Sequence, residues 1–142
     1  MAANETRVLI CEDDEALVEL LQTRFELAGY RTFVARSGGV VVDSAINNKP
    51  HAIVLDIGLP VIDGFKVLER LKADARVKNI PVMMLTARHA RDDVQKTIQM
   101  GAKDYLTKPF DDKILLARVA RLISLAAAKA GPAKDEGTVT YL

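Results

Sequence analysis

Short apolar runs alternate with longer segments of helical periodicity along this chain. The apolar runs cover residues 7–11, 31–35, 52–56, 80–86 and 104–107. After the first run, Leu17, Leu21 and Phe25 recur at helical spacing, and helical patterns follow the other runs, the last extending from about residue 111 to 128. Strands that alternate with helices of this length predict βαβ units, and therefore one parallel sheet with helices on both faces.

Two local features predict how the second and third helices begin. Ser37 follows the second apolar run and is expected to cap a helix over residues 37–48. Asp63 and Gly64 predict a turn into the third helix, in which the glycine adopts an unusual φ. We therefore assign structural roles to these positions.

The alternating pattern predicts a single α/β domain over residues 7–128. A chain of 142 residues is long enough for one domain with a substantial core and too short for two ordinary ones. Residues 1–6 are expected to form a short N-terminal extension. Residues 129–142 contain two glycines and a proline without periodicity, which predicts a flexible tail or the stub of a linker.

Composition and charge place the function in a local site. The chain is 49% hydrophobic and 27% charged, and its formal net charge of +1 gives no overall attraction to nucleic acid or to an anionic membrane. Its single cysteine, Cys11, excludes an internal disulfide and a cysteine-based zinc site. No apolar stretch approaches the ~18 residues that span a membrane, and no signal-peptide hydrophobic region is visible. We therefore expect a cytoplasmic protein.

Polar and charged side chains stand at the ends of four of the five predicted strands. Glu12 and Asp13 follow the first strand, Asp56 ends the third, Thr86 ends the fourth and Lys108 follows the fifth. In an open parallel sheet, ligands bind outside the carboxyl ends of the strands. The sequence therefore predicts that these groups meet in one site.

The combination of groups suits phosphoryl transfer. Carboxylates that converge on one point repel each other unless a cation lies between them, and oxygen ligands without histidine or cysteine favour Mg²⁺. A carboxylate can itself be the nucleophile and form an acyl phosphate. A metal ion, an ammonium group and a hydroxyl group can together balance the charge of the phosphoryl oxygens.

Four motifs carry a resemblance to a known family. They are ICEDDE (10–15), VLDIGLPVIDG (54–64), MMLTAR (83–88) and GAKDYLTKPF (101–110), each at the carboxyl end of a predicted strand. In this order and spacing the chain resembles the receiver domain of two-component response regulators over roughly residues 5–125. The resemblance implies a CheY-like, flavodoxin-like fold: a doubly wound five-stranded parallel sheet of order 2-1-3-4-5 with helices on both faces.

The resemblance also implies the roles of the acidic residues. Asp56 corresponds to the phosphoacceptor. Glu12 and Asp13 correspond to the acidic pair that holds Mg²⁺ together with Asp56 and the backbone carbonyl of Gly58, with Mn²⁺ as an alternative ion. Asp13 is expected to contact the metal directly, and Glu12 through water.

Four further roles are carried over from the family in the same way. Thr86 and Lys108 are expected to contact the phosphoryl group. The bond between Lys108 and Pro109 is expected to be cis. Tyr105 corresponds to an aromatic switch residue that turns inward when Thr86 moves toward the phosphate.

The function implied by the resemblance is a phosphorylation-dependent signalling switch. A histidine kinase or a histidine phosphotransfer protein would phosphorylate Asp56, and the surface formed by the fourth helix, fifth strand and fifth helix would then change for a downstream protein or for dimerisation. The domain would be regulatory and would catalyse only its own phosphorylation and dephosphorylation. We expect no direct binding to nucleic acid or membrane.

The predicted partner surface departs from the pattern of the receivers that the C-terminal motif resembles. Asp104 and Arg118 fit one of the ion pairs that such receivers carry there. Val94 and Ile114 instead replace a basic and an acidic residue. Either the two side chains form an apolar partner-binding patch, or Val94 belongs to the core and Ile114 is incidental.

Two other interpretations compete with the switch. Aspartyl-phosphate phosphatases and mutases on related α/β scaffolds usually carry a second acid two residues after the nucleophile, and Gly58 occupies that position here. A degenerate receiver would bind partners without phosphorylation, and the presence of Asp13, Asp56, Thr86 and Lys108 argues against it.

Overall fold

A parallel sheet of five strands forms the centre of the chain, in the order β2-β1-β3-β4-β5 that was predicted. The computed structural model describes residues 5–87 and 91–130. In chain order its elements are β1 (Thr6–Cys11), α1 (Glu15–Leu27), β2 (Tyr30–Ala35), the 3₁₀ turn η2 (Gly38–Val40), α2 (Val41–Asn48), β3 (Ala52–Leu55), α3 (Gly64–Ala73), β4 (Val82–Thr86), α4 (Arg91–Gln99), β5 (Asp104–Thr107) and α5 (Asp112–Ala130). The predicted α/β class and strand order are therefore confirmed.

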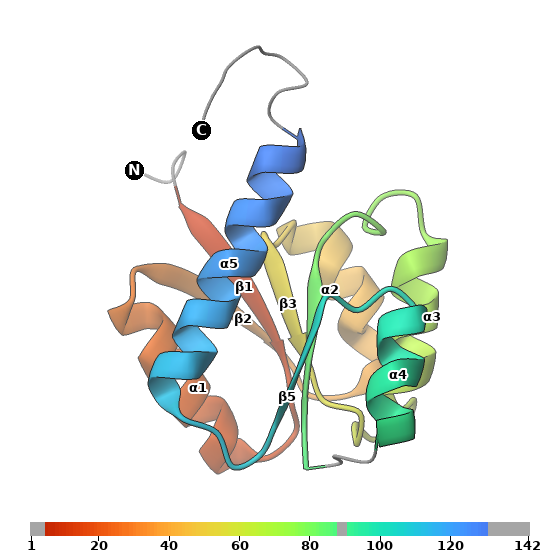
Figure 1. Cartoon of the computed structure of the whole chain (residues 1–142), viewed down its shortest axis with the longest axis horizontal. Helices are drawn as coiled ribbons and strands as arrows, with labels where there is room; N and C mark the ends of the chain where they lie inside the picture. The colour runs from red at the N-terminus through yellow and green to blue at the C-terminus, as the bar shows by residue number, and fades with distance from the viewer. Residues whose placement is uncertain (1–4, 88–90, 131–142) are drawn as a thin grey trace.

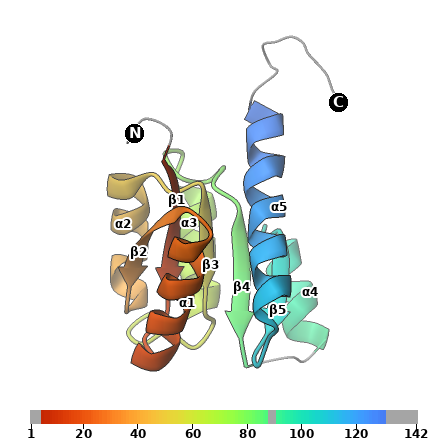
Figure 2. The same cartoon turned by 90° about the vertical axis from the view of Figure 1, so that its left-hand side faces the viewer.

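The two faces of the sheet are covered by different helices, as Figures 1 and 2 show. Successive side chains of a strand point to opposite faces. Val8 and Ile10 of β1 accordingly belong to the core that α1 and α5 cover, and Leu9 and Cys11 belong to the core that α2 and α3 cover. Because β1 is buried on both faces, it appears in the sequence as a continuous apolar run.

The ends of several elements differ slightly from the predicted ranges. β4 begins at Val82 rather than at residue 80, because the N–H of Ile80 donates to the C=O of Val77 at 3.0 Å and Pro81 has no N–H for the ladder. α5 continues to Ala130. Residues 1–4 and 131–142 of the predicted extension and tail lie outside the described residues. Among the residues described, no helix has the length and apolar character needed to cross a bilayer.

The start of the second helix was predicted incorrectly. Ser37 precedes η2 but makes no side-chain capping hydrogen bond, and α2 itself begins only at Val41. The two glycines after Ser37 form the 3₁₀ turn, because Gly38 is held close to the loop that follows β3, where its N–H donates to the C=O of Pro60 at 3.0 Å.

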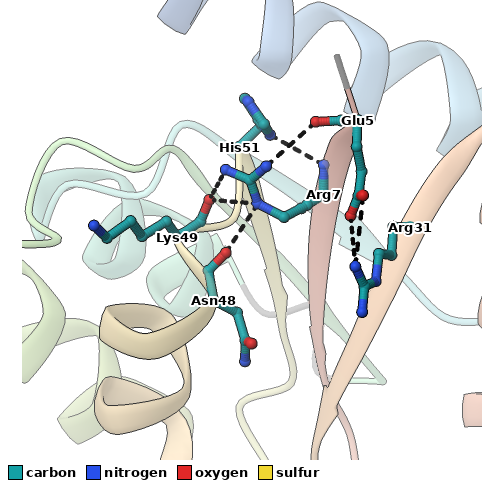
Figure 3. A network of polar contacts seen from close by, with 6 residues as sticks. All are labelled: Glu5, Arg7, Arg31, Asn48, Lys49 and His51. Atoms are coloured by element: carbon teal, nitrogen blue, oxygen red, sulfur yellow. Dashed lines mark hydrogen bonds and ion pairs between the residues drawn. The ribbon is translucent and has the colours of Figure 1, made fainter. Parts of the chain in front are cut away.

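A polar network closes the amino-terminal edge of the sheet (Figure 3). The guanidinium of Arg7 donates to the C=O groups of Asn48 and Lys49, at 2.9 and 2.8 Å, where α2 ends. The backbone N–H of Arg7 donates to Nδ1 of His51 at 3.0 Å. His51 is half-buried, and burial and the charge of Arg7 lower the pKa of its imidazole.

Candidate functional site

The carboxyl ends of the strands lie at the lower edge of the molecule in Figure 1. The predicted side chains of Glu12, Asp56 and Lys108 come together at this edge. Cys11 and Leu55, the last residues of β1 and β3, are paired neighbours in the sheet. The residues that follow them, Glu12 and Asp56, are therefore brought side by side. The N–H of Asp56 donates to the C=O of Cys11 at 3.0 Å, which continues the ladder into the site.

Three carboxylates lie close enough together to share a cation. One oxygen from each of Glu12, Asp13 and Asp56 lies within 4.8 Å of the others. Glu12 is 2% exposed and Asp56 is 8% exposed, whereas Asp13 is open to solvent. Charged groups that are shielded from water need compensation from other charges or from hydrogen bonds. The site is therefore a recessed anionic cluster with one exposed side.

Lys108 supplies the positive charge of the cluster. Its Nζ lies 2.9 Å from Oε1 of Glu12 and 3.4 Å from Oδ2 of Asp56. Lys108 follows β5, its N–H donates to the C=O of Thr86 at 2.8 Å, and its peptide bond to Pro109 is cis. These contacts join the ends of β1, β3, β4 and β5 in one site.

Burial and ion pairing act against each other on the pKa values of this cluster. Burial raises the pKa of the Glu12 carboxyl, and the hydrogen bond from Lys108 opposes the shift without cancelling it. Burial alone would lower the pKa of Lys108, but its hydrogen bond to Glu12 and the charge of Asp56 outweigh burial and raise that pKa. Lys108 therefore stays a cation at neutral pH.

The donor set of this cluster fits Mg²⁺. Three carboxylates and one ammonium group leave a net charge of −2, which a divalent cation balances. All the side-chain ligands are oxygen atoms, which hard cations prefer. Backbone N–H groups already orient two of the carboxylates: Gly58 donates to Oδ1 of Asp56, and Asp14 donates to Oε2 of Glu12, each at 3.1 Å. The acids are thus held in place by the chain itself.

Thr86 and Tyr105 lie on the same face of the sheet. Thr86 pairs with Thr107, and Met84 pairs with Tyr105. Because residues two apart on a strand share a face, Thr86 is on the face of Met84 and Tyr105. Thr86 is 2% exposed at the end of β4, and Tyr105 is half-buried against the core beneath α2 and α3. The two predicted switch residues therefore belong to adjacent strands on one face.

Gly64 has a structural role, but the reason for its being a glycine differs from the prediction. Positive φ values among the glycines described occur at Gly29 and Gly101, not at Gly64. A Cβ on Gly64 would instead lie 2.5 Å from the backbone oxygen of Asp56 and 2.5 Å from Cα of Ile57. The glycine allows the start of α3 to pack directly on the backbone of Asp56 and Ile57.

Two other residues of the loop between β3 and α3, Asp63 and Gly58, cap α3 and leave space beside Asp56. The Oδ1 of Asp63 accepts from the N–H of Lys66 at 3.0 Å and so caps α3. Gly58 is exposed, and a Cβ there would lie 3.8 Å from Oδ2 of Asp56, in ordinary contact. The structure could therefore accommodate a side chain at position 58. Because glycine has none, the approach to Asp56 from this side is open.

Sequence reasoning missed the contact that anchors the start of α5. The guanidinium of Arg24 on α1 forms an ion pair with Asp112, in the first turn of α5. Asp112 follows the loop that carries Lys108. An acid in the first turn of a helix is visible in the sequence, but it is explained by the helix dipole alone, and nothing indicates a partner 88 residues away.

The predicted partner surface contains one ion pair and an exposed apolar side chain. Nη1 of Arg118 lies 3.2 Å from Oδ1 of Asp104. Ile114 on α5 is 46% exposed, whereas Val94 on α4 is half-buried. The exposure of Ile114 agrees with its position away from the core side of its helix. Val94 contributes only part of its side chain to the surface.

Comparisons with known proteins agree on one family. Residues 8–120 match the family model of the response regulator receiver domain. The chain is 40% identical over 141 residues to the DNA-binding dual master transcriptional regulator RpaA of Synechocystis, a match that covers 96% of this chain and 58% of that relative. The chain thus spans less than two thirds of the relative's length.

Solved structures show the same fold. The receiver domain of a Francisella response regulator superposes with a TM-score of 0.79 at 31% identity, over 85% of this chain and 98% of that one. The receiver domain of a sensor histidine kinase from Pseudomonas aeruginosa superposes with a TM-score of 0.78 at 29% identity, over 84% and 98% of the two chains. In that structure a magnesium ion is coordinated in the active-site cleft.

Proposed function

Because the chain belongs to the response regulator receiver family, we propose that it is a phosphorylation-dependent switch whose Asp56 accepts a phosphoryl group from a histidine kinase or a histidine phosphotransfer protein. The observation that carries this proposal is the recessed cluster in which Lys108 lies 2.9 Å from Glu12 and 3.4 Å from Asp56. A lysine that bridges two shielded carboxylates at the carboxyl edge of a parallel sheet is suited to bind an incoming anion.

Mg²⁺ is the cofactor that the site fits. Glu12, Asp13 and Asp56, with the backbone carbonyl of Gly58, would hold it. When bound, the ion neutralises charge on the phosphoryl oxygens. The exposed carboxylate of Asp13 lies on the open side of the cluster, where an ion from solution arrives first.

The chemical step is an exchange of one bond to phosphorus for another. A carboxylate oxygen of Asp56 forms the new O–P bond while the P–N bond of the donor phosphohistidine breaks, and the imidazole leaves with the electron pair. The N–H of Gly58 holds the Asp56 carboxylate in position. The ammonium of Lys108 shifts its pairing from the carboxylates to the new phosphoryl oxygens, and the hydroxyl of Thr86 donates to one of them.

The phosphorylated site then alters the surface of α4, β5 and α5. The phosphoryl group adds roughly one negative charge and new acceptor oxygens. Movement of Thr86 toward the phosphate opens space on its face of the sheet, and Tyr105 turns inward to fill it. Tyr105 follows Asp104 and its C=O accepts from Arg118 at 3.3 Å, so the movement reaches the ion pair of the partner surface.

The partner surface combines the Asp104–Arg118 pair with the exposed side chain of Ile114. We include Val94 of α4 in this surface as the apolar counterpart of Ile114 on α5. A downstream protein or a second copy of the chain would cover it in the active state. The Synechocystis relative is DNA-binding as a whole, and that the present chain does not itself contact nucleic acid is part of this proposal.

Phosphorylation of Asp56 is tested by incubation with Mg²⁺ and acetyl phosphate, followed by intact mass measurement. One phosphoryl group is expected on the wild type and none on Asp56→Asn. Asp63→Asn is the matched control, because Asp63 is an exposed acid of the same loop and asparagine still caps a helix. Equal labelling of Asp56→Asn and the wild type would contradict the proposal.

A further inference from the structure

The loop between β3 and α3 contains a strained turn at Val61. The φ of Val61 is 73°, a region that residues with a branched Cβ rarely adopt. The N–H of Ile62 donates to the C=O of Pro60 at 2.9 Å. This bond and the positive φ together define the rare, strained form of the γ-turn. The chain therefore keeps a branched side chain at a position where glycine would be free of strain.

Backbone contacts at both ends of the loop hold this turn in place. The N–H of Gly38 donates to the C=O of Pro60 at 3.0 Å, and a Cβ on Gly38 would lie 1.9 Å from the backbone oxygen of Ile62. At the other end, the N–H of Gly64 donates to the C=O of Ile57 at 2.7 Å. The turn is therefore braced by η2 on one side and by the end of β3 on the other, so its position is fixed.

Packing inside the molecule does not account for the side chain at this turn. Val61 is 84% exposed, the largest exposed fraction among the large hydrophobic side chains of the described residues. It lies over Gly39, where a Cβ would be 3.6 Å from Cγ1 of Val61. Val40, the next residue, is 49% exposed. We call Gly39, Val40 and Val61 the apolar rim.

Val61 of the apolar rim lies in the loop between β3 and α3, which begins at the proposed phosphoacceptor. Asp56 begins the loop that carries Val61, and only 8% of Asp56 is exposed. A phosphohistidine on a protein reaches such a recessed carboxylate only if the protein lays its own surface on the loops around it. A small phosphodonor enters through the open side at Gly58 and has no need of Val61. A protein donor that covers this loop can therefore also cover Val61, whereas a small donor need not touch it.

We propose that Val61 is a specificity-determining contact for the protein phosphodonor, a fixed apolar side chain that the donor covers when its phosphohistidine reaches Asp56. This inference rests on the proposed function. Strained residues persist at binding sites because the surrounding structure holds them there. At Val61 the strained turn fixes the position of the contacting side chain before the donor arrives. A fixed contact costs less conformational entropy on binding than a mobile one.

The test compares two kinds of donor on three variants. Val61→Asn and Val61→Gly both remove the apolar side chain, and both residues tolerate a positive φ, so the fold is retained and thermal unfolding checks it. Leu27→Asn is the control, because Leu27 is 79% exposed at the far end of α1. The donors are acetyl phosphate and the purified, autophosphorylated histidine kinases encoded in the same genome.

With the kinase that phosphorylates the wild type fastest, the kcat/KM of phosphoryl transfer to both Val61 variants should fall about tenfold. A loss of this size is expected when a central apolar contact is removed from an interface. Labelling by acetyl phosphate should stay at the wild-type rate, and Leu27→Asn should behave as the wild type with both donors. Wild-type transfer from the kinase to both Val61 variants would overturn the inference. Equal losses with both donors would also overturn it, because Val61 would then act on the loop and not on the donor.

Failure of acetyl phosphate to label the wild type would instead refute the proposed function, and this inference with it.

Discussion

Replacing Gly64 with alanine should both destabilise the domain and disturb the phosphoacceptor. The added Cβ would lie 2.5 Å from the backbone oxygen of Asp56 and from Cα of Ile57. Normal contacts between such atoms are about 3.5 Å, so the backbone has to move by about 1 Å. Both neighbours are backbone atoms next to a buried strand, and neither can rotate away as the end of a side chain would.

The size of the effect follows from two opposing contributions. Overpacking of a buried position costs about 1–3 kcal/mol. Replacement of glycine by alanine recovers about 0.4–1 kcal/mol by restricting the unfolded chain. The net loss in the free energy of unfolding is therefore about 1–2 kcal/mol, or about 3–8 °C in Tm for a domain of this size. The rate of labelling by acetyl phosphate should fall as well, because the displaced backbone carries Asp56.

Gly39→Ala is the matched control for Gly64→Ala. A Cβ on Gly39 would make an ordinary contact with Val61, at 3.6 Å, so this variant should be as stable as the wild type or slightly more stable. Urea unfolding monitored by circular dichroism gives the free energies of the three proteins. If Gly64→Ala is as stable as Gly39→Ala, the close approach of α3 to the Asp56 backbone does not explain why position 64 is a glycine.

Three further predictions concern other parts of the molecule. The pKa of His51 is lowered in the fold from its ordinary value of 6.5, so the unfolded chain binds more protons between the two values; stability should be greatest above pH 6.5 and fall as the pH drops through the lowered value. His51→Asn, whose Oδ1 can still accept from Arg7, should lose that part of the pH dependence in unfolding experiments, and an unchanged profile would contradict the assignment. Asp13→Asn should raise Tm in EDTA, because it relieves repulsion in the acidic cluster, and should reduce the rise in Tm that Mg²⁺ gives the wild type; an equal rise in both proteins would place the ion elsewhere. Val94→Asp and Ile114→Asp should weaken association of the beryllofluoride-activated chain with its partner or with itself, measured by size-exclusion chromatography with light scattering, and unchanged association would remove both residues from the partner surface.

The fold and the site could be predicted because strand ends carry most of the information. Each buried strand appears as an apolar run, and the parallel order of the sheet brings the residues after those runs to one edge. Glu12, Asp56 and Lys108 were therefore expected together before their distances were known. The pairing of Asp104 with Arg118 could be expected from the family pattern.

Features that depend on backbone contacts between distant loops could not be predicted. The glycine at position 64 suggested an unusual φ. The structure instead requires glycine there because a Cβ would lie too close to the backbone of Asp56. The positive φ of Val61 has no signal in the sequence, since valine is among the residues least suited to it. The partner of His51 is likewise hidden, because Arg7 is 44 residues away and comes close to it only when β1 and β3 pair.

The most direct test of the account is to locate the phosphoryl group chemically. After incubation with Mg²⁺ and acetyl phosphate, borohydride reduces an acyl phosphate to the alcohol and releases phosphate, so a phosphorylated aspartate becomes homoserine. Peptide mass spectrometry should find homoserine at position 56 and at neither Asp13 nor Asp63. Homoserine at another acid, or an Asp56 that stays unmodified while the protein takes up phosphate, would contradict the assignment of Asp56 as the phosphoacceptor.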